Sequence, residues 1–155
     1  MRHIEINSDS WYLLTQEIVS IFTPGELISH EWLKKKFHLK ELKFKDYANE
    51  EDFIKALEAR QFDYMFLIDT LRFQLLEARK GYLKNVHREG YTILPFDQQV
   101  KYGYDKFIKT VNGSIKKTDM IIKYVPPVSA AQQVIDNDIR ARYSTLKQML
   151  SGIKK

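Results

Sequence analysis

The stretch that decides the fold is residues 71–94, LRFQLLEARKGYLKNVHREGYTIL. It begins inside a helical pattern, which Gly81 is expected to stop because glycine accepts a left-handed conformation. From Tyr82 to His87 the pattern alternates and is rich in strand formers. Arg88-Glu89-Gly90 can turn, and residues 91–94 form a return strand that Pro95 ends. This stretch therefore predicts a helix followed by a β-hairpin.

Three helices are predicted before this hairpin, each starting at a side chain that can accept a hydrogen bond from an unpaired backbone amide. The expected caps are Ser8, Asp9 or Ser10 for a helix over about 11–22, Ser29 for the second helix and Asn49 for the third. The third helix is expected to run to Lys80, either continuously or with an interruption near residues 61–63. Residues 38–48, between the second and third helices, are expected to form a loop or a short strand.

Two further helices are expected after the hairpin. From Asp97, apolar residues at helical spacing form a long stripe that Pro126-Pro127 ends. Ser129 is the expected cap of a last helix, whose apolar face runs from Val134 to Leu150. Such stripes are typical of a helical hairpin packed on its own domain. The alternative is that they serve dimerisation or docking on a partner.

Charge is distributed unevenly along the 155 residues, whose net charge is +5. Residues 1–62 carry nine Lys and Arg against eleven Asp and Glu, a net of about −2. Residues 97–155 carry eleven against five, a net of about +6. A basic segment fits an anionic partner such as nucleic acid. The alternative is a solvated, lysine-rich helix surface.

The order of three helices and a two-stranded hairpin is that of a winged helix-turn-helix domain. The residues around the hairpin also resemble the winged-helix output domains of bacterial response regulators. In that family the third helix ends in a Leu-Arg-x-x-Leu step, which Leu71 to Leu75 match. The family's wing reads roughly I-R-T-V-R-G-x-G-Y, and Leu83, Val86 and Gly90-Tyr91 match its apolar positions and its final pair.

The overall layout also resembles small winged-helix proteins encoded by bacteriophages and prophages, with a basic two-helix tail. We therefore expect an α+β fold that is mainly α. It would comprise a winged helix-turn-helix domain over residues 1–95, with an insertion around 38–62, and a basic C-terminal helical hairpin over 96–155.

The resemblance implies a way of binding DNA, in which the third helix enters the major groove and the wing lies against the backbone or the minor groove. The nucleic-acid-binding residues implied by the resemblance are Arg72 and Arg79 of the third helix and Lys84, His87 and Arg88 of the wing. Lys101, Lys116 and Lys117 of the basic tail are expected to add further phosphate contacts. Double-stranded DNA is the expected partner. A homodimer formed through the C-terminal helices would bind two half-sites one DNA turn apart.

Two departures from the family pattern bear on this expectation. Arg88 stands where the family has the first wing glycine, so the turn must form differently. Residues 65–70, Met-Phe-Leu-Ile-Asp-Thr, stand where the family has polar groups that reach base edges. Asp69 near phosphates is repulsive unless it pairs with cytosine. Either the register is shifted, or this helix does not read bases in the usual way.

The cysteine, histidine and glycine residues of the chain show no pattern that is typical of an enzyme. The chain has no cysteine, and His3, His30, His38 and His87 are dispersed, without the spacing of metal ligands. We expect His30 on a helix surface. The six glycines are isolated, so no phosphate-binding loop is expected. We therefore expect no metal, no cofactor and no enzymatic activity.

The N-terminal residues are mixed and polar, so no signal peptide is expected. No uncharged run reaches the roughly 18 residues of a membrane span. The expected location is the cytoplasm, which is the host cytoplasm if a phage encodes the protein.

Together these patterns predict a non-enzymatic DNA-binding protein, a winged-helix regulator of transcription or replication of the kind that phages encode. The alternative is a protein-interaction module that binds and inhibits or redirects a host protein. The apolar stretch Phe66–Ile68 and the apolar stripes of the tail favour this alternative.

Overall fold

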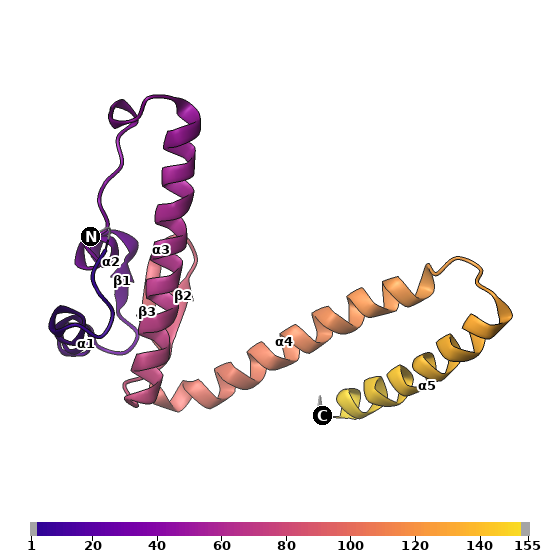
Figure 1. Cartoon of the computed structure of the whole chain (residues 1–155). Coiled ribbons are helices and arrows are strands. Elements are labelled where there is room, and N and C mark those ends of the chain that lie inside the picture. The colour runs from indigo at the N-terminus through magenta and orange to yellow at the C-terminus, as the bar shows by residue number, and fades with distance from the viewer. Residues whose placement is uncertain (1–2, 153–155) are drawn as a thin grey trace. The chain divides into compact units, whose positions relative to one another are not determined.

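The computed structural model describes residues 3–152, and it is mainly helical with one three-stranded antiparallel sheet (Figure 1). The chain divides into two compact units, Met1–Gln99 and Val100–Lys155. The first unit contains α1 (Asp9–Ile21), β1 (Leu27–Ser29), α2 (His30–Lys36), the 3-10 turn η1 (Phe44–Asp46), α3 (Glu50–Glu77), β2 (Leu83–Val86) and β3 (Gly90–Ile93). Helix α4 (Phe96–Lys123) begins in the first unit and continues through the second, where α5 (Ala130–Gly152) follows it. The α+β, mainly helical class is as the sequence predicts.

The helices begin at the expected caps. The side chains of Ser8, Ser29 and Asn49 accept hydrogen bonds from backbone amides three residues ahead, at 3.2, 3.2 and 2.8 Å. Ser129 does the same for α5, at 3.3 Å. Each bond satisfies an amide that has no partner within its own helix. The starts of these four helices are therefore set by local sequence.

The end of α3 differs from the prediction. The helix ends at Glu77 rather than Lys80, and Arg79, not Gly81, is the first residue in the left-handed region, with φ of 55°. The Lys80 amide donates to Leu75 O at 2.8 Å and the Arg79 amide to Leu76 O at 2.9 Å. These two bonds form a Schellman cap, which pairs the last helical carbonyls. The capping bonds stabilise a conformation that arginine would otherwise avoid.

Helix α3 is continuous over 28 residues, without an interruption near residues 61–63. Its first half extends beyond the sheet, beside the chain segment that carries η1 (Figure 1). Phe53 of α3 packs there against the rings of Phe44 and Tyr47, at 5.5 and 5.4 Å between centroids. The segment expected as a loop or short strand therefore forms a loop with one 3-10 turn.

The hairpin forms as predicted, from β2 and β3, and a third strand that the sequence analysis missed joins it. Strand β1 pairs antiparallel with β3, Ile28 opposite Tyr91 and Ser29 opposite Gly90, so that β3 lies in the centre of the sheet. A strand of three residues is too short to show the alternation that identifies longer strands. Its partner strand β3 lies more than 60 residues further along the chain, so local sequence does not reveal the pairing.

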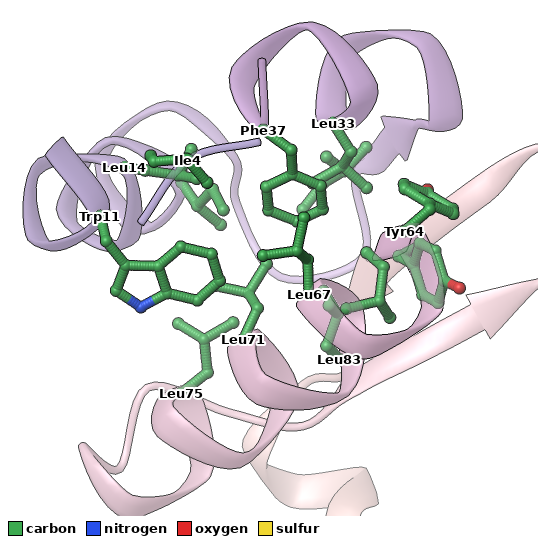
Figure 2. Close-up of a cluster of buried hydrophobic side chains, with 14 of the residues drawn as sticks. Ile4, Trp11, Leu14, Leu33, Phe37, Tyr64, Leu67, Leu71, Leu75 and Leu83 are labelled. Atoms are coloured by element: carbon green, nitrogen blue, oxygen red, sulfur yellow. The ribbon is translucent and has the colours of Figure 1, made fainter. Parts of the chain in front are cut away.

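The core of the first unit lies where α1, α2, α3 and the sheet converge (Figure 2). Trp11 of α1 stacks on Phe37, which follows α2, at 5.9 Å between ring centroids. Leu67 and Leu71 of α3 and Leu83 of β2 have no exposed surface. Burial of such side chains is the main term that stabilises the unit, at about 1.5–3 kcal/mol each. The second unit differs, because none of its described residues, 100–152, is buried.

We expect Gly90→Ala to destabilise the first unit by more than about 2 kcal/mol. Gly90 has φ of 153°, and a Cβ there would overlap Ile28 O and lie 2.9 Å from Ser29 Cα, because β1 passes directly beside it. Thermal unfolding of the full chain measures the loss. Gly103→Ala in α4 is the control, since a Cβ there meets nothing within 4 Å and the helix should not lose stability. Equal effects of the two substitutions would contradict the close approach of β1.

Candidate nucleic-acid interface

Helix α3 presents two different faces, and their residues decide what it can contact. One face is buried in the core, and it consists of Tyr64, Leu67, Ile68, Leu71 and Leu75. Its opposite face is also apolar but exposed. This exposed set, here called the α3 apolar face, has exposed fractions of 70% for Phe62, 52% for Met65, 60% for Phe66, 60% for Phe73 and 41% for Leu76.

Asp69 lies in the middle of the α3 apolar face, and 68% of its side chain is exposed. Direct readout of base edges needs hydrogen-bond donors and acceptors at the helix surface, with Arg, Lys, Asn and Gln the usual side chains. The five residues around Asp69 on this face are three phenylalanines, a methionine and a leucine, which supply neither. The Asp69 carboxylate also adds negative charge at the place where phosphates would approach. This surface of α3 is therefore poorly suited to a DNA groove.

Arg72 makes three contacts inside the first unit. It forms an ion pair with Asp69, and its Nε donates to Leu83 O at 3.0 Å. Its guanidinium also lies over the rings of Tyr82 and Tyr91, at 5.6 and 6.0 Å from their centroids. Arg72 thereby connects α3 to the start of the hairpin. Its predicted role in nucleic-acid binding would compete with these contacts.

The other four candidate residues of the first unit are spread along the hairpin. Arg79 is exposed just beyond the end of α3, and Lys84 is half-buried in β2, opposite Thr92. His87 and Arg88 are exposed in the turn, where Arg88 takes the left-handed conformation with φ of 65°. Arg88 thus adopts the conformation for which the family uses glycine. Since β2 spans roughly 13 Å, the turn and the start of the hairpin are separate surfaces.

The candidate residues of the tail all lie on α4. Lys101 forms an ion pair with Asp105 at 2.6 Å, whereas Lys116 and Lys117 are exposed. Lys109, Lys116 and Lys123 recur every seven residues, so they share one stripe of the helix. Lys117 flanks this stripe, and we call the four residues the α4 lysine face. Within residues 3–152, none of the four forms a salt bridge with an acidic side chain.

Helix α5 contacts a different side of α4. Tyr143 donates to Asp119 Oδ1 at 2.9 Å, and Lys147 pairs with the same carboxylate at 2.7 Å. These hydrogen bonds lower the pKa of Asp119 below its usual value. Arg140 donates to Ile122 O at 3.1 Å. The bonds place α5 along the Asp119 side of α4, and the α4 lysine face remains open to solvent.

A polar cluster that the sequence analysis missed joins α2, α3 and β3. His30 was expected on a helix surface, but it is half-buried between the rings of Tyr64 and Tyr91, at 5.8 and 5.5 Å. Its Nδ1 hydrogen-bonds the Tyr64 hydroxyl at 2.8 Å. Burial, and after it the charge of Lys34, lowers the pKa of His30. No local sequence pattern predicts this cluster, because Tyr64 lies 34 residues after His30 and Tyr91 lies 27 residues after Tyr64.

Neither a metal-binding cluster nor a membrane-spanning helix is found in the described part of the chain. Across residues 3–152, no three His, Cys, Asp or Glu side chains gather as a metal site requires. No helix there has the length and apolar character needed to cross a membrane. Comparison with protein-family models, curated proteins and solved structures finds no match. The functional argument therefore rests on the surfaces of α3, the hairpin and α4.

We expect Arg72→Gln to lower the free energy of unfolding of the first unit by about 1–3 kcal/mol, because it removes hydrogen bonds of a charged, half-buried group. Arg88→Gln, at the exposed turn, should change it by less than about 0.5 kcal/mol. Urea unfolding of the full chain compares the two variants. A small and equal effect of both would contradict the structural role of Arg72.

We expect His30 to make stability depend on pH. Because its folded-state pKa is below the usual 6.5, its contribution is present above that pH and is lost as the pH falls toward the folded-state value. The melting temperature should therefore drop less between about pH 7.5 and about pH 5.5 in His30→Gln than in the parent chain. His87→Gln, exposed in the turn, is the control and should leave the drop unchanged. An unchanged drop in His30→Gln would contradict this assignment.

Proposed function

We propose that the first unit is a winged helix-turn-helix domain. The order of its elements, α1-β1-α2-α3-β2-β3, supports this, because a hairpin follows the third helix as a wing does. The central position of β3 between β1 and β2 supports it too, since the sheet then closes one end of the helical core. The long connection of residues 37–49 and the extended first half of α3 are departures from a short helix-turn-helix connection.

We propose further that the protein is a non-enzymatic, cytoplasmic DNA-binding protein that holds duplex DNA mainly by its phosphates. The observation that carries this proposal is the α4 lysine face, where four exposed charges lie along one helix and form no salt bridge with any acidic side chain of residues 3–152. The stripe from Lys109 to Lys123 spans roughly 21 Å, which matches several phosphates along one strand. Phosphate contacts of this kind position a protein but carry no sequence information.

The hairpin turn is a second contact surface in this proposal. His87 and Arg88 are exposed there, at the tip where a wing meets the DNA backbone. The α3 apolar face takes no part, since its five side chains offer no hydrogen-bonding group and Asp69 between them is paired with Arg72. The proposed binding is therefore strongly dependent on salt and only weakly dependent on sequence. A regulator of transcription or replication with these properties would obtain its target specificity from a partner.

The second candidate function is a protein-interaction module. The α3 apolar face favours it, because exposed aromatic clusters of this size usually mark contact sites. The open apolar stripes of the second unit also favour it, in the form of a homodimer through α4 and α5. Val100, Phe107, Ile139 and Leu146 are each at least half-exposed. A helix normally buries its apolar stripe against another element, and two more helices would bury these.

The DNA-binding proposal is tested by titrating the full chain with a duplex at about 50 mM and about 200 mM salt. The logarithm of the affinity should fall linearly with the logarithm of the salt concentration. The double variant Lys116→Gln/Lys117→Gln should reduce the slope by about 2 and weaken binding equally for unrelated sequences.

The matched control is Lys40→Gln/Lys43→Gln, which changes the net charge equally at exposed positions of the loop in the first unit. It should leave the slope within about one unit of the parent value. Absence of binding at the lower salt concentration, or an equal loss in the control, would reject DNA binding through α4. The protein-interaction module would then be the better proposal.

A further inference from the structure

The α3 apolar face is an exposed surface that the proposed DNA contacts leave unused. Taking about 200 Å² for a large side chain, its five residues expose roughly 500 Å². Two such surfaces in contact would bury about 1,000 Å² before any flanking residue is included. Stable protein interfaces bury about 1,200–2,000 Å² in total. The two α3 apolar faces therefore fall just short of this range by themselves, and the residues that flank them would supply the rest of the interface.

Four of the five residues of the α3 apolar face are spaced symmetrically about Asp69. Phe62 and Leu76 lie seven residues before and after it, and Met65 and Phe73 lie four residues before and after it. A twofold contact is self-complementary, because each residue meets a partner that meets it in return. Two antiparallel α3 helices crossing at Asp69 would place Phe62 opposite Leu76 and Met65 opposite Phe73. Phe66, the fifth residue of the face, would come level with Arg72 of the second copy.

The charges along α3 favour the antiparallel orientation. The helix begins with Glu50, Glu51 and Asp52, and the chain just beyond its end carries Arg79 and Lys80. In the antiparallel pair, Glu58 comes level with Lys80 of the second copy. A parallel pair would instead place acids beside acids and bases beside bases, which is unfavourable. At the centre, each Asp69 already pairs with Arg72 of its own chain.

We propose that two copies of the chain pair through their α3 apolar faces, antiparallel, with the twofold axis at Asp69. The pairing removes the exposed phenylalanines from water, and it is independent of whether the protein binds DNA. It also joins the first units of two chains into a single assembly. That assembly presents two hairpin turns to an external partner.

The absence of cysteine from the chain permits a direct test by single-cysteine variants. A disulfide needs Cα atoms within about 7 Å. Asp69→Cys should therefore form a disulfide-linked dimer under mild oxidation. Phe62→Cys alone should not, because the two copies of residue 62 lie roughly 21 Å apart along the helix axis. A mixture of Phe62→Cys with Leu76→Cys should give the mixed dimer.

A crosslink in Phe62→Cys alone would indicate a parallel pair and overturn the proposed orientation. A failure of both Asp69→Cys and the mixed pair to crosslink would overturn the contact at α3. The crosslinks are measured without DNA, so their failure is separate from a failure of the duplex titration.

The oligomeric state of the reduced chain is the second measurement. The mass in solution should correspond to a dimer for the parent chain and to a monomer for Phe66→Glu/Phe73→Glu. Both residues are exposed within the unit, so the melting temperature extrapolated to low concentration should stay close to that of the parent. The control Ile139→Glu/Leu146→Glu alters α5 instead and should leave the dimer intact.

A monomeric parent chain would overturn the proposal. A dimer that only the α5 variant dissociates would overturn it too, in favour of pairing through the C-terminal helices.

Discussion

One row of leucines on α3 organises the first unit. Leu67, Leu71 and Leu75 lie along the buried face of the helix, and α1, α2 and the hairpin each pack a side chain against that row (Figure 2). Removing any of these leucines would leave a cavity, at a cost of about 2–5 kcal/mol. The strands depend on the same row, because Leu83 brings β2 against it and β3 follows through the ladder. β1 pairs with the other edge of β3.

The exposed surfaces of α3 and α4 differ in chemistry, because α3 exposes apolar side chains and α4 exposes lysines. Since one face of α3 is buried, its other face is left to solvent with three phenylalanines, and Arg72 is held between α3 and the hairpin. A stripe of positive charge lies instead on α4, where Lys109, Lys116 and Lys123 recur every seven residues. A helix that offers aromatic rings suits another protein surface, and a helix that offers lysines suits phosphates. The two proposals therefore concern different helices and do not compete for residues.

The features that the sequence predicted are those with local causes. Ser29 and Asn49 begin helices because their side chains reach amides three residues away. The hairpin follows from alternation around a short turn. The features that were missed have distant causes: β1 is a strand because β3 lies beside it, and His30 is half-buried because Tyr64 and Tyr91 enclose it. The end of α3 was also misplaced, because capping hydrogen bonds hold Arg79 in the left-handed conformation that was expected at Gly81.

The sequence by itself determined the starts of the helices, the hairpin and the excess of base in the tail, since each depends on neighbouring residues or on composition. The tertiary structure alone decided which side of α3 is the core. Apolar residues occur on both sides of that helix, so their spacing predicts a helix without telling its inner face from its outer one. The inner face is the one on which α1, α2 and β2 pack, and Phe62, Phe66 and Phe73 on the other face remain exposed. The predicted DNA-reading helix thereby becomes a candidate surface for a second copy of the chain.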